Sequence, residues 1–250
     1  MPLPEGPRPP EPNRICGVAA VRALFLRRPE AVLRLFYTPE RRPVAGPLCA
    51  QMARARRPYR EVPADELARV AGTPHHGGIV AVAVARHAVP LTGAVLPPGV
   101  AGVLPVLDGI GNPHNLGAIA RSAAFFGAAG LLLSTDPRQA DLSDAAFRVA
   151  EGGLEHLAVF STADLPALLR GLRPGWLTLA AVASGGALPR DIPCGRPIAL
   201  VLGNEETGLP PATLAACEAR VTLRGGAAVE SLNVAAAAAV LLHALGKTAD

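Results

Sequence analysis

Apolar residues follow two patterns along the chain, and the stronger one lies in its last 150 residues or so. There, short uninterrupted apolar runs alternate with segments whose apolar positions recur at helical spacing. Strands that are apolar along their whole length are typical of a parallel sheet covered by helices on both faces. This pattern predicts an α/β domain with a parallel sheet, whose strands are residues 103–107, 130–133, 157–160, 177–182, 198–202 and 219–223.

The first third of the chain predicts a smaller α/β unit. Apolar positions recur at helical spacing in residues 15–26, which predicts a helix. Residues 50–57 suit a basic helix, and residues 64–71 suit another. Residues 32–37 and 79–85 are rich in β-branched or aromatic side chains, which predicts two strands.

Two stretches of unusual composition set the expected domain boundaries. Residues 1–13 are rich in proline and poor in apolar side chains, which predicts a disordered tail. Residues 87–102 have the proline and glycine content of a linker. We therefore expect a small domain at residues 14–86 and a larger one at residues 103–250.

The overall composition narrows the class of protein. Half of the residues are apolar, which allows a sizeable core, yet no apolar stretch reaches the roughly 18 residues expected of a membrane span. The first residues lack the pattern of a secretory signal, so we expect a cytoplasmic protein. Four scattered cysteines show no paired spacing typical of zinc or a redox dithiol, which predicts buried thiols and no metal site. A disulfide is the alternative.

Charge is distributed unevenly along the chain. Residues 1–86 contain 14 arginines and 7 acidic residues, a net charge of +7, whereas residues 87–250 contain 10 basic and 13 acidic residues, a net charge of −3. This asymmetry predicts an anionic partner, with nucleic acid the leading candidate, for the first third of the chain. The alternative is a compositional bias towards arginine.

Three separate segments place glycine beside polar side chains at the end of an apolar run. They are residues 108–121, 202–209 and 230–234. Ligands of parallel sheets bind beyond the carboxyl ends of the strands, where Asp108 and Gly203 are both expected. The three segments therefore predict a single ligand site.

In order and spacing, these segments resemble the three motifs of the SpoU/TrmH family of RNA ribose methyltransferases, over roughly residues 103–245. Residues 14–18, 29–34 and 73–80 more weakly resemble the ribosomal-protein-like substrate domain that many members carry in front. The resemblance implies transfer of a methyl group from S-adenosylmethionine to a ribose 2′-hydroxyl of structured RNA, tRNA or rRNA. It also implies a trefoil knot and a homodimer with the active site near its interface.

The resemblance also assigns candidate site residues. Arginine is always protonated, so Arg121 is expected to orient an RNA phosphate and stabilise the developing alkoxide. The alternatives are that Asn115, Ser231 and Asn233 cap helices and that Arg121 and Glu205 are ordinary surface charges. The implied catalytic residues are Asn115, Arg121, Glu205, Ser231 and Asn233, and the implied cofactor contacts are Gly203, Leu223 and Leu232.

Two geometric expectations concern the helices of the larger domain. Asn115 and Arg121 would point about 120° apart on one helix, so a shared target requires Asn115 to lie on the preceding loop. The pair Asn112-Pro113 supports a helix start nearby. Residues 234–245 are apolar on almost every side, so we expect a buried helix, packed within the subunit or against a second copy.

Contacts with RNA are expected mainly from the small domain. The candidates are Arg54, Arg56, Arg57, Arg60 and His76, because guanidinium groups suit phosphate. For His76, the alternative is that it shapes a turn.

The chain departs from the family pattern at Arg224-Gly225-Gly226, where members usually have proline and methionine after the apolar cofactor contact. An alternative function is therefore an RNA-binding relative without affinity for the methyl donor. A Rossmann-type oxidoreductase has weak support, because Gly109-Ile-Gly111 lacks the third glycine of the dinucleotide-binding motif.

Overall fold

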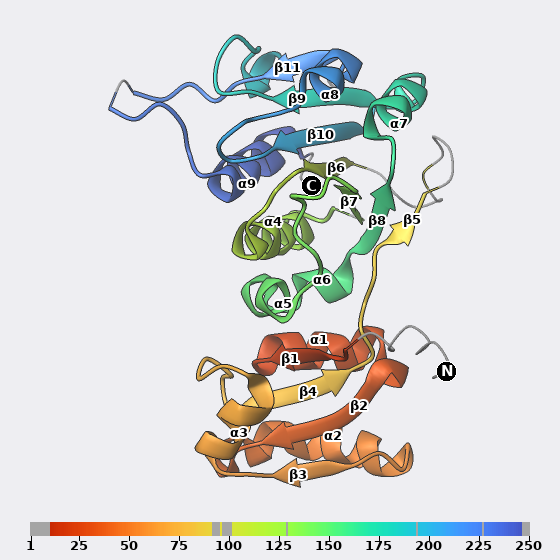
Figure 1. Cartoon of the computed structure of the whole chain (residues 1–250), viewed down its shortest axis with the longest axis vertical. Coiled ribbons are helices and arrows are strands. Elements are labelled where there is room, and N and C mark those ends of the chain that lie inside the picture. The colour runs from red at the N-terminus through yellow and green to blue at the C-terminus, as the bar shows by residue number, and fades with distance from the viewer. Residues whose placement is uncertain are drawn as a thin grey trace, which may run out of the picture. The chain divides into compact units, whose positions relative to one another are not determined.

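The computed structural model describes residues 11–91, 96, 102–128, 130–193, 195–226 and 228–246. The chain forms two compact units, Met1–His87 and Ala88–Asp250 (Figure 1). Most of the expected tail and linker therefore lies outside the described residues.

The N-terminal unit is built on a four-stranded mixed sheet of order β1-β4-β2-β3. Strand β4 pairs antiparallel with both β1 and β2, and β2 pairs parallel with β3. Three α-helices contact this sheet. The elements are β1 (Asn13–Cys16), α1 (Val18–Arg27), β2 (Val32–Tyr37), α2 (Arg42–Arg54), β3 (Tyr59–Glu61), α3 (Ala64–Ala71) and β4 (Ile79–Ala83), with 3-10 turns η1 (Pro29–Ala31) and η2 (Pro39–Arg41).

Local backbone explains where the sequence predictions for this unit were wrong. Ile15 lies in strand β1, because Gly17, with a φ of 91°, ends the strand and precedes helix α1. Helix α2 begins at Arg42, with proline in its first turn, and ends at Arg54, so the helix expected at residues 50–57 lies too late. Strand β3 was not predicted, since its three residues are exposed or half-buried.

The C-terminal unit contains a seven-stranded sheet in which every pair is parallel, in the order β11-β9-β10-β6-β7-β8-β5. This confirms the predicted parallel sheet. The strands are β5 (Val89–Pro90), β6 (Val103–Asp108), β7 (Gly130–Ser134), β8 (Ala158–Thr162), β9 (Leu177–Ala181), β10 (Ile198–Gly203) and β11 (Ala219–Val221). The helices are α4 (Pro113–Phe125), α5 (Asp144–Ala150), α6 (Gly153–His156), α7 (Leu165–Leu172), α8 (Pro211–Ala216) and α9 (Val234–Leu245), with the 3-10 turn η3 (Pro189–Asp191).

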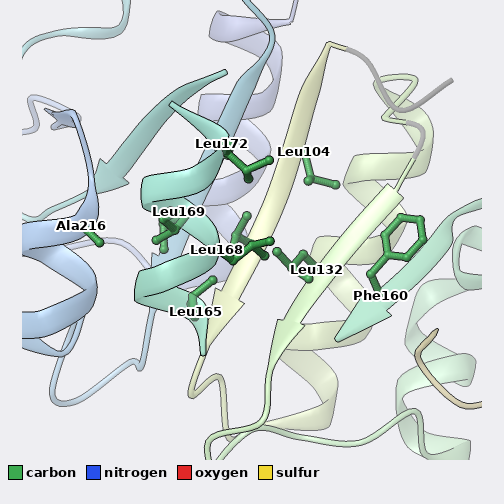
Figure 2. Packing of buried hydrophobic residues seen from close by; sticks show 11 residues of the cluster. Leu104, Leu132, Phe160, Leu165, Leu168, Leu169, Leu172 and Ala216 are labelled. Carbon is green, nitrogen blue, oxygen red and sulfur yellow. The ribbon is translucent and has the colours of Figure 1, made fainter. Parts of the chain in front are cut away.

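One face of this sheet packs against α7 and α8. Alternate residues of the central strands, such as Leu104 and Val106 of β6, meet a row of leucines on α7. Figure 2 shows α7 lying over the strands, with other helices on the far side of the sheet. Helices α4 and α9 contact each other and strands β6, β7 or β10. The apolar composition of the strands follows from this coverage on both faces.

Two predictions for this unit need correction. The expected linker begins with a strand, because Val89 and Pro90 form β5 and pair with β8 at the edge of the sheet, where proline is tolerated. Helix α9 has the predicted bounds, but within it only Ala238, Leu241 and Leu242 are buried. Val240 is 45% exposed, so the helix leaves one apolar side uncovered in the described chain.

Candidate active site

Strand register brings the first two polar segments to the same edge of the parallel sheet. Strands β6 and β10 are neighbours, and Asp108 pairs with Gly203 at their carboxyl ends. Strand β11 is parallel to β9 and therefore ends at this edge too. From there the chain leaves the sheet and returns at α9, which packs on α4 (Figure 1). The predicted meeting of the segments thus follows from the topology.

Three polar side chains from these segments join in one chain of hydrogen bonds. Asn115 of α4 donates from Nδ2 to Oε1 of Glu205, over 2.6 Å. Asn233 in turn donates from Nδ2 to Oδ1 of Asn115, over 3.1 Å. The other amide atom of Asn233, Oδ1, accepts the backbone N–H of Ala235 and caps α9. Asn233 therefore fills both roles that the sequence allowed, capping a helix and joining the candidate site.

Asn204 shapes the loop that carries Glu205. Its Nδ2 donates to the carbonyl of Gly109, over 2.8 Å, and its Oδ1 accepts the backbone N–H groups of Glu206 and Thr207. Two backbone hydrogen bonds to Gly208 close the loop. Sequence reasoning did not single out Asn204, although it lies in the second segment, and its position directly after a glycine-ended strand was the available signal.

Gly203 is required by this loop. A β-carbon there would lie 2.5 Å from the carbonyl carbon of Gly208 and 2.6 Å from the backbone nitrogen of Leu209. The missing side chain thus accommodates the protein's own backbone, where sequence analysis had expected an adenosyl group to approach. Steric need explains this glycine without a ligand.

A fourth segment, the loop after β7, was missed by sequence analysis because it carries no motif. Arg138 donates from Nη1 to the hydroxyl of Thr207, over 3.2 Å, and binds both carboxylate oxygens of Asp136. Hydrogen bonds from the Arg138 side chain and backbone lower the pKa of Asp136 to about 2. Gln139 exchanges two hydrogen bonds with the backbone of Ile110. The loop after β7 therefore holds the loops of the first two motif segments in place, through Ile110 and Thr207.

Arg121 lies apart from the three joined side chains. Asn115 is the third residue of α4, so the expectation that it sits on the preceding loop is wrong; Pro113 starts the helix and Asn112 caps it. Six helical positions separate Asn115 from Arg121, which then points about 120° away. Its Nη2 contacts Oε2 of Glu151, over 3.0 Å. Among the described residues, the side-chain contact of Arg121 is to Glu151 and not to another predicted site residue.

The remaining implied cofactor contacts lie on the segment between β11 and α9. Leu223 is half-buried, and Ser231 and Leu232 are exposed. The residues that depart from the family pattern, Arg224 to Gly226, are also exposed. A β-carbon at Gly225 or Gly226 would meet no atom within 4 Å, so close packing does not explain these two glycines.

The five RNA candidates of the N-terminal unit differ in what they contact. Arg54 and Arg56 are exposed and make no ion pair with described residues. Arg60 pairs with Glu66 over 3.1 Å and stays two-thirds exposed. Arg57 donates to two backbone carbonyls, and His76 is 9% exposed and accepts the N–H of Gly78. These contacts give Arg57 a structural role and His76 the turn-shaping one.

Other features of the described chain add no reactive group. Asp108 is buried and accepts a 2.6 Å hydrogen bond from Thr213, which ties the end of β6 to α8. Burial raises the pKa of the Cys217 thiol to about 11, so this cysteine is a poor nucleophile. Among described residues, no three His, Cys, Asp or Glu side chains gather in a way that could hold a metal. Nor is any described helix both long and apolar enough for a bilayer.

A cavity of about 340 Å³ lies at the opposite edge of the sheet from the motif loops. It is lined by the amino ends of β6 and β10 and by the last residues of α4 and α9, including Phe126 and Leu242. This hollow has a mixed lining that includes Arg196, and it brings together none of the candidate catalytic residues.

Comparison with known proteins shows the family to which both parts of the chain are similar. Residues 102–243 match the model of the SpoU rRNA Methylase family, and residues 14–88 match a model described as RNA 2′-O ribose methyltransferase substrate binding. The chain is 33% identical over 235 residues to the uncharacterized tRNA/rRNA methyltransferase YfiF of Escherichia coli O157:H7, covering 93% of this chain and 67% of YfiF. It is 31% identical over 247 residues to the 23S rRNA (guanosine-2′-O-)-methyltransferase RlmB of Acinetobacter baylyi, covering 93% of this chain and 96% of RlmB.

Solved structures share the fold. An rRNA methyltransferase from Sinorhizobium meliloti superposes with a TM-score of 0.75 at 24% identity, covering 94% of this chain and 86% of the other. Its AdoMet-bound form gives a TM-score of 0.74 at 23% identity, with 94% and 87% covered. With a methylase region that spans more than half of its length, the chain belongs to the SpoU family of RNA methyltransferases.

Proposed function

We propose that the protein transfers the methyl group of S-adenosylmethionine to a ribose 2′-hydroxyl in a structured tRNA or rRNA. The observation that carries this proposal is the hydrogen-bonded set Asn115, Glu205 and Asn233, which gathers three distant motif segments at one sheet edge. Family membership makes the oxidoreductase alternative untenable.

The segment before α9 has the chemistry to hold the methyl donor. Val229 is 71% exposed and Leu232 is 52% exposed, and both lie close in sequence to Asn233. Exposed apolar side chains beside convergent polar groups suit an adenosyl group, which has an apolar face and polar edges. When bound, S-adenosylmethionine would supply an electrophilic methyl group on a positively charged sulfur.

In this reaction the ribose oxygen bonds to the methyl carbon while the carbon–sulfur bond breaks, leaving S-adenosylhomocysteine. The hydroxyl proton passes to a base, and a nearby RNA phosphate oxygen or carboxylate is suited to accept it. Arg121 binds the phosphate and stabilises negative charge on the ribose oxygen. Asn115, Glu205, Ser231 and Asn233 position the reacting groups.

We further propose that the enzyme is a homodimer whose site combines residues of two copies. Phe125 of α4 is 82% exposed and Val240 of α9 is 45% exposed, so these contacting helices leave apolar surface uncovered. Arg121 lies on this helix pair and points about 120° away from Asn115. A second copy seated on α4 and α9 would supply the arginine that each site lacks.

RNA binding is assigned to the N-terminal unit, where the exposed Arg54, Arg56 and Arg60 offer guanidinium groups to phosphate. Arg57 and His76 are left out of this surface, because they support the unit's own backbone. The trefoil knot stays a prediction from the family resemblance, and the cytoplasmic location stays a prediction from the lack of a secretory signal pattern.

The test of the activity is methyl transfer from a labelled donor to total tRNA and rRNA, followed by mapping of the modified riboses. Calorimetric titration with S-adenosylmethionine in the same preparation separates the enzyme from a relative without donor affinity, which the exposed Arg224-Gly225-Gly226 segment would otherwise favour. Failure of folded protein both to bind the donor and to label RNA would contradict the proposal.

The composite site is tested by mixing two impaired variants, Arg121→Ala and Asn115→Asp. After subunit exchange at equal concentration, half of the dimers carry both variants and have one intact site, so activity should return to about a quarter of the normal value. No recovery, in a mixture proven by mass spectrometry to contain heterodimers, would mean that each subunit acts alone.

A further inference from the structure

We propose that Glu151 is a positioning residue for methyl transfer, which holds the guanidinium of Arg121 in its reactive orientation. This inference rests on the proposed function of Arg121. The family resemblance assigns no role to Glu151, which lies outside the three motif segments.

The contact leaves most of the guanidinium available to a ligand. Nη2 of Arg121 lies 3.0 Å from Oε2 of Glu151, and both side chains are more than half exposed, at 57% and 53%. A guanidinium has five N–H groups in a rigid plane, so holding one edge fixes the direction of the others. Glu151 can therefore orient Arg121 without blocking it.

The backbone of Glu151 indicates that stability does not account for this residue. Glu151 ends helix α5 in the left-handed region, with φ 44° and ψ 42°, where glycine is the usual residue. Among described non-glycine residues, only Arg56 shares a positive φ. Left-handed backbone costs stability at a residue with a side chain, and an exposed ion pair returns little of it. Strain of this kind is often found at functional sites.

Close packing anchors the turn that carries Glu151. A β-carbon at Gly153 would lie 2.9 Å from the Cα of Arg121 and 2.9 Å from the carbonyl oxygen of Ala120. One turn earlier on α4, a β-carbon at Gly117 would lie 2.5 Å from the carbonyl oxygen of Ala146 in α5. Both glycines therefore let this turn and α5 lie directly against neighbouring backbone. The backbone that carries the Glu151 carboxylate is therefore packed close to Arg121.

A positioning role makes a distinctive kinetic prediction. A carboxylate repels RNA phosphate, so Glu151 does not add affinity for RNA; it limits the orientations of Arg121 before and during the reaction. Small misplacements of a catalytic group can cost up to about 100-fold in rate. Loss of the Glu151 charge should therefore lower kcat and leave KM for RNA unchanged or slightly lower.

The experiment compares Glu151→Gln, Glu151→Gly and Glu151→Asp in steady-state methyl transfer. Glu151→Gln keeps the shape and should lower kcat roughly 10-fold or more. Glu151→Gly suits the left-handed backbone, so it should lower kcat at least as far with an unchanged or higher Tm. Glu151→Asp keeps the charge and should recover part of kcat. Unchanged kcat in Glu151→Gln, or a loss of kcat that follows Tm across the three variants, would overturn the proposal.

Two further measurements separate this idea from the proposed function. In an Arg121→Lys background that retains measurable activity, Glu151→Gln should have little additional effect, because its partner is already altered. In the free protein, NMR of the Arg121 Nε–H group should show greater side-chain mobility in Glu151→Gln than in the unaltered chain. Equal mobility would refute positioning whether or not the protein methylates RNA, whereas absent methylation with the expected mobility change would refute only the proposed function.

Discussion

The first turn of helix α4 and a position in its second half offer side chains of the proposed site in different settings. Asn115, in the first turn, contacts Glu205 and Asn233 from two other segments, and the loops behind them are tied together by Asn204 and Arg138. Arg121, two turns later, contacts a single exposed carboxylate. The difference teaches that the described chain joins three of the proposed site residues and leaves Arg121 facing outwards.

Helix α4 can present both Asn115 and Arg121 because its packing contacts cover neither side chain completely. Glycines at positions 117 and 153 let α5 and α6 approach the backbone of α4 closely, while Asn112 and Pro113 begin the helix at the sheet edge. The helix is thus clamped along one side, with Asn115 directed to the loops and Arg121 to the surface. Variants that change Asn115 or Arg121 separately test whether the two residues have different roles.

The largest effect is expected for Arg121→Ala. Removing a group that stabilises developing negative charge typically costs about 100- to 1,000-fold in kcat. Binding of S-adenosylmethionine, measured by calorimetry, should be retained, because Arg121 lies apart from the Asn115 group. Arg170→Ala is the matched control, since Arg170 is an exposed arginine on another helix of the same unit. Near-normal turnover in Arg121→Ala would remove its assigned role.

A smaller effect on turnover is expected for Asn115→Asp. This change sets a carboxylate in place of the amide that donates to Glu205 over 2.6 Å, and like charges at that distance repel. We expect a loss of roughly 10- to 100-fold in kcat/KM for the methyl donor, because a hydrogen bond to a charged group is lost and repulsion is added. The control is His114→Ala, which removes an exposed neighbour on the same turn. Equal kinetics for the two variants would show that the Asn115–Glu205 bond does not matter for catalysis.

Gly153→Ala should lower the stability of the protein by disturbing the packing of α6 against α4 beside Arg121. The new β-carbon would sit 2.9 Å from backbone atoms of α4, and overpacking of this kind costs about 1–3 kcal/mol. The Tm should fall by roughly 3–10 °C in thermal denaturation. Gly175→Ala is the control, because no atom lies within 4 Å of its β-carbon position. If Tm falls equally in both variants, close packing of α6 on α4 is not the cause.

The smallest effect is expected for the Asp136–Arg138 ion pair, which supports the loops near Asn115 and should make stability depend on pH. The pKa of Asp136 falls from 3.8 to about 2 because Arg138 binds its charged form. A carboxylate with a lowered folded-state pKa stabilises the protein above about pH 4, and this contribution is lost as the pH falls towards 2. Arg138→Gln should therefore lower Tm slightly at pH 6, and the difference from the unaltered chain should shrink towards pH 2. A difference that is constant over this range would exclude the ion pair as its source.

Local sequence was sufficient for much of the C-terminal unit. Apolar runs located six strands of the parallel sheet, and the helix at Val234–Leu245 has its predicted bounds. Short elements were missed: β3 and β5 have three and two residues, too few for periodicity to register. The start of α4 was misplaced relative to Asn115, although the Asn112-Pro113 signal for it was correctly noted.

By itself, the sequence determined the candidate site residues, because the three motif segments and their order are visible along the chain and resemble those of a known family. Tertiary structure alone decided their partners. Strand order brought Asn115, Glu205 and Asn233 within hydrogen-bonding distance, and helical rotation turned Arg121 towards Glu151. The physical reason is that such contacts span 30 to 118 positions of sequence, and their geometry is set by sheet register and helix packing rather than by any local propensity.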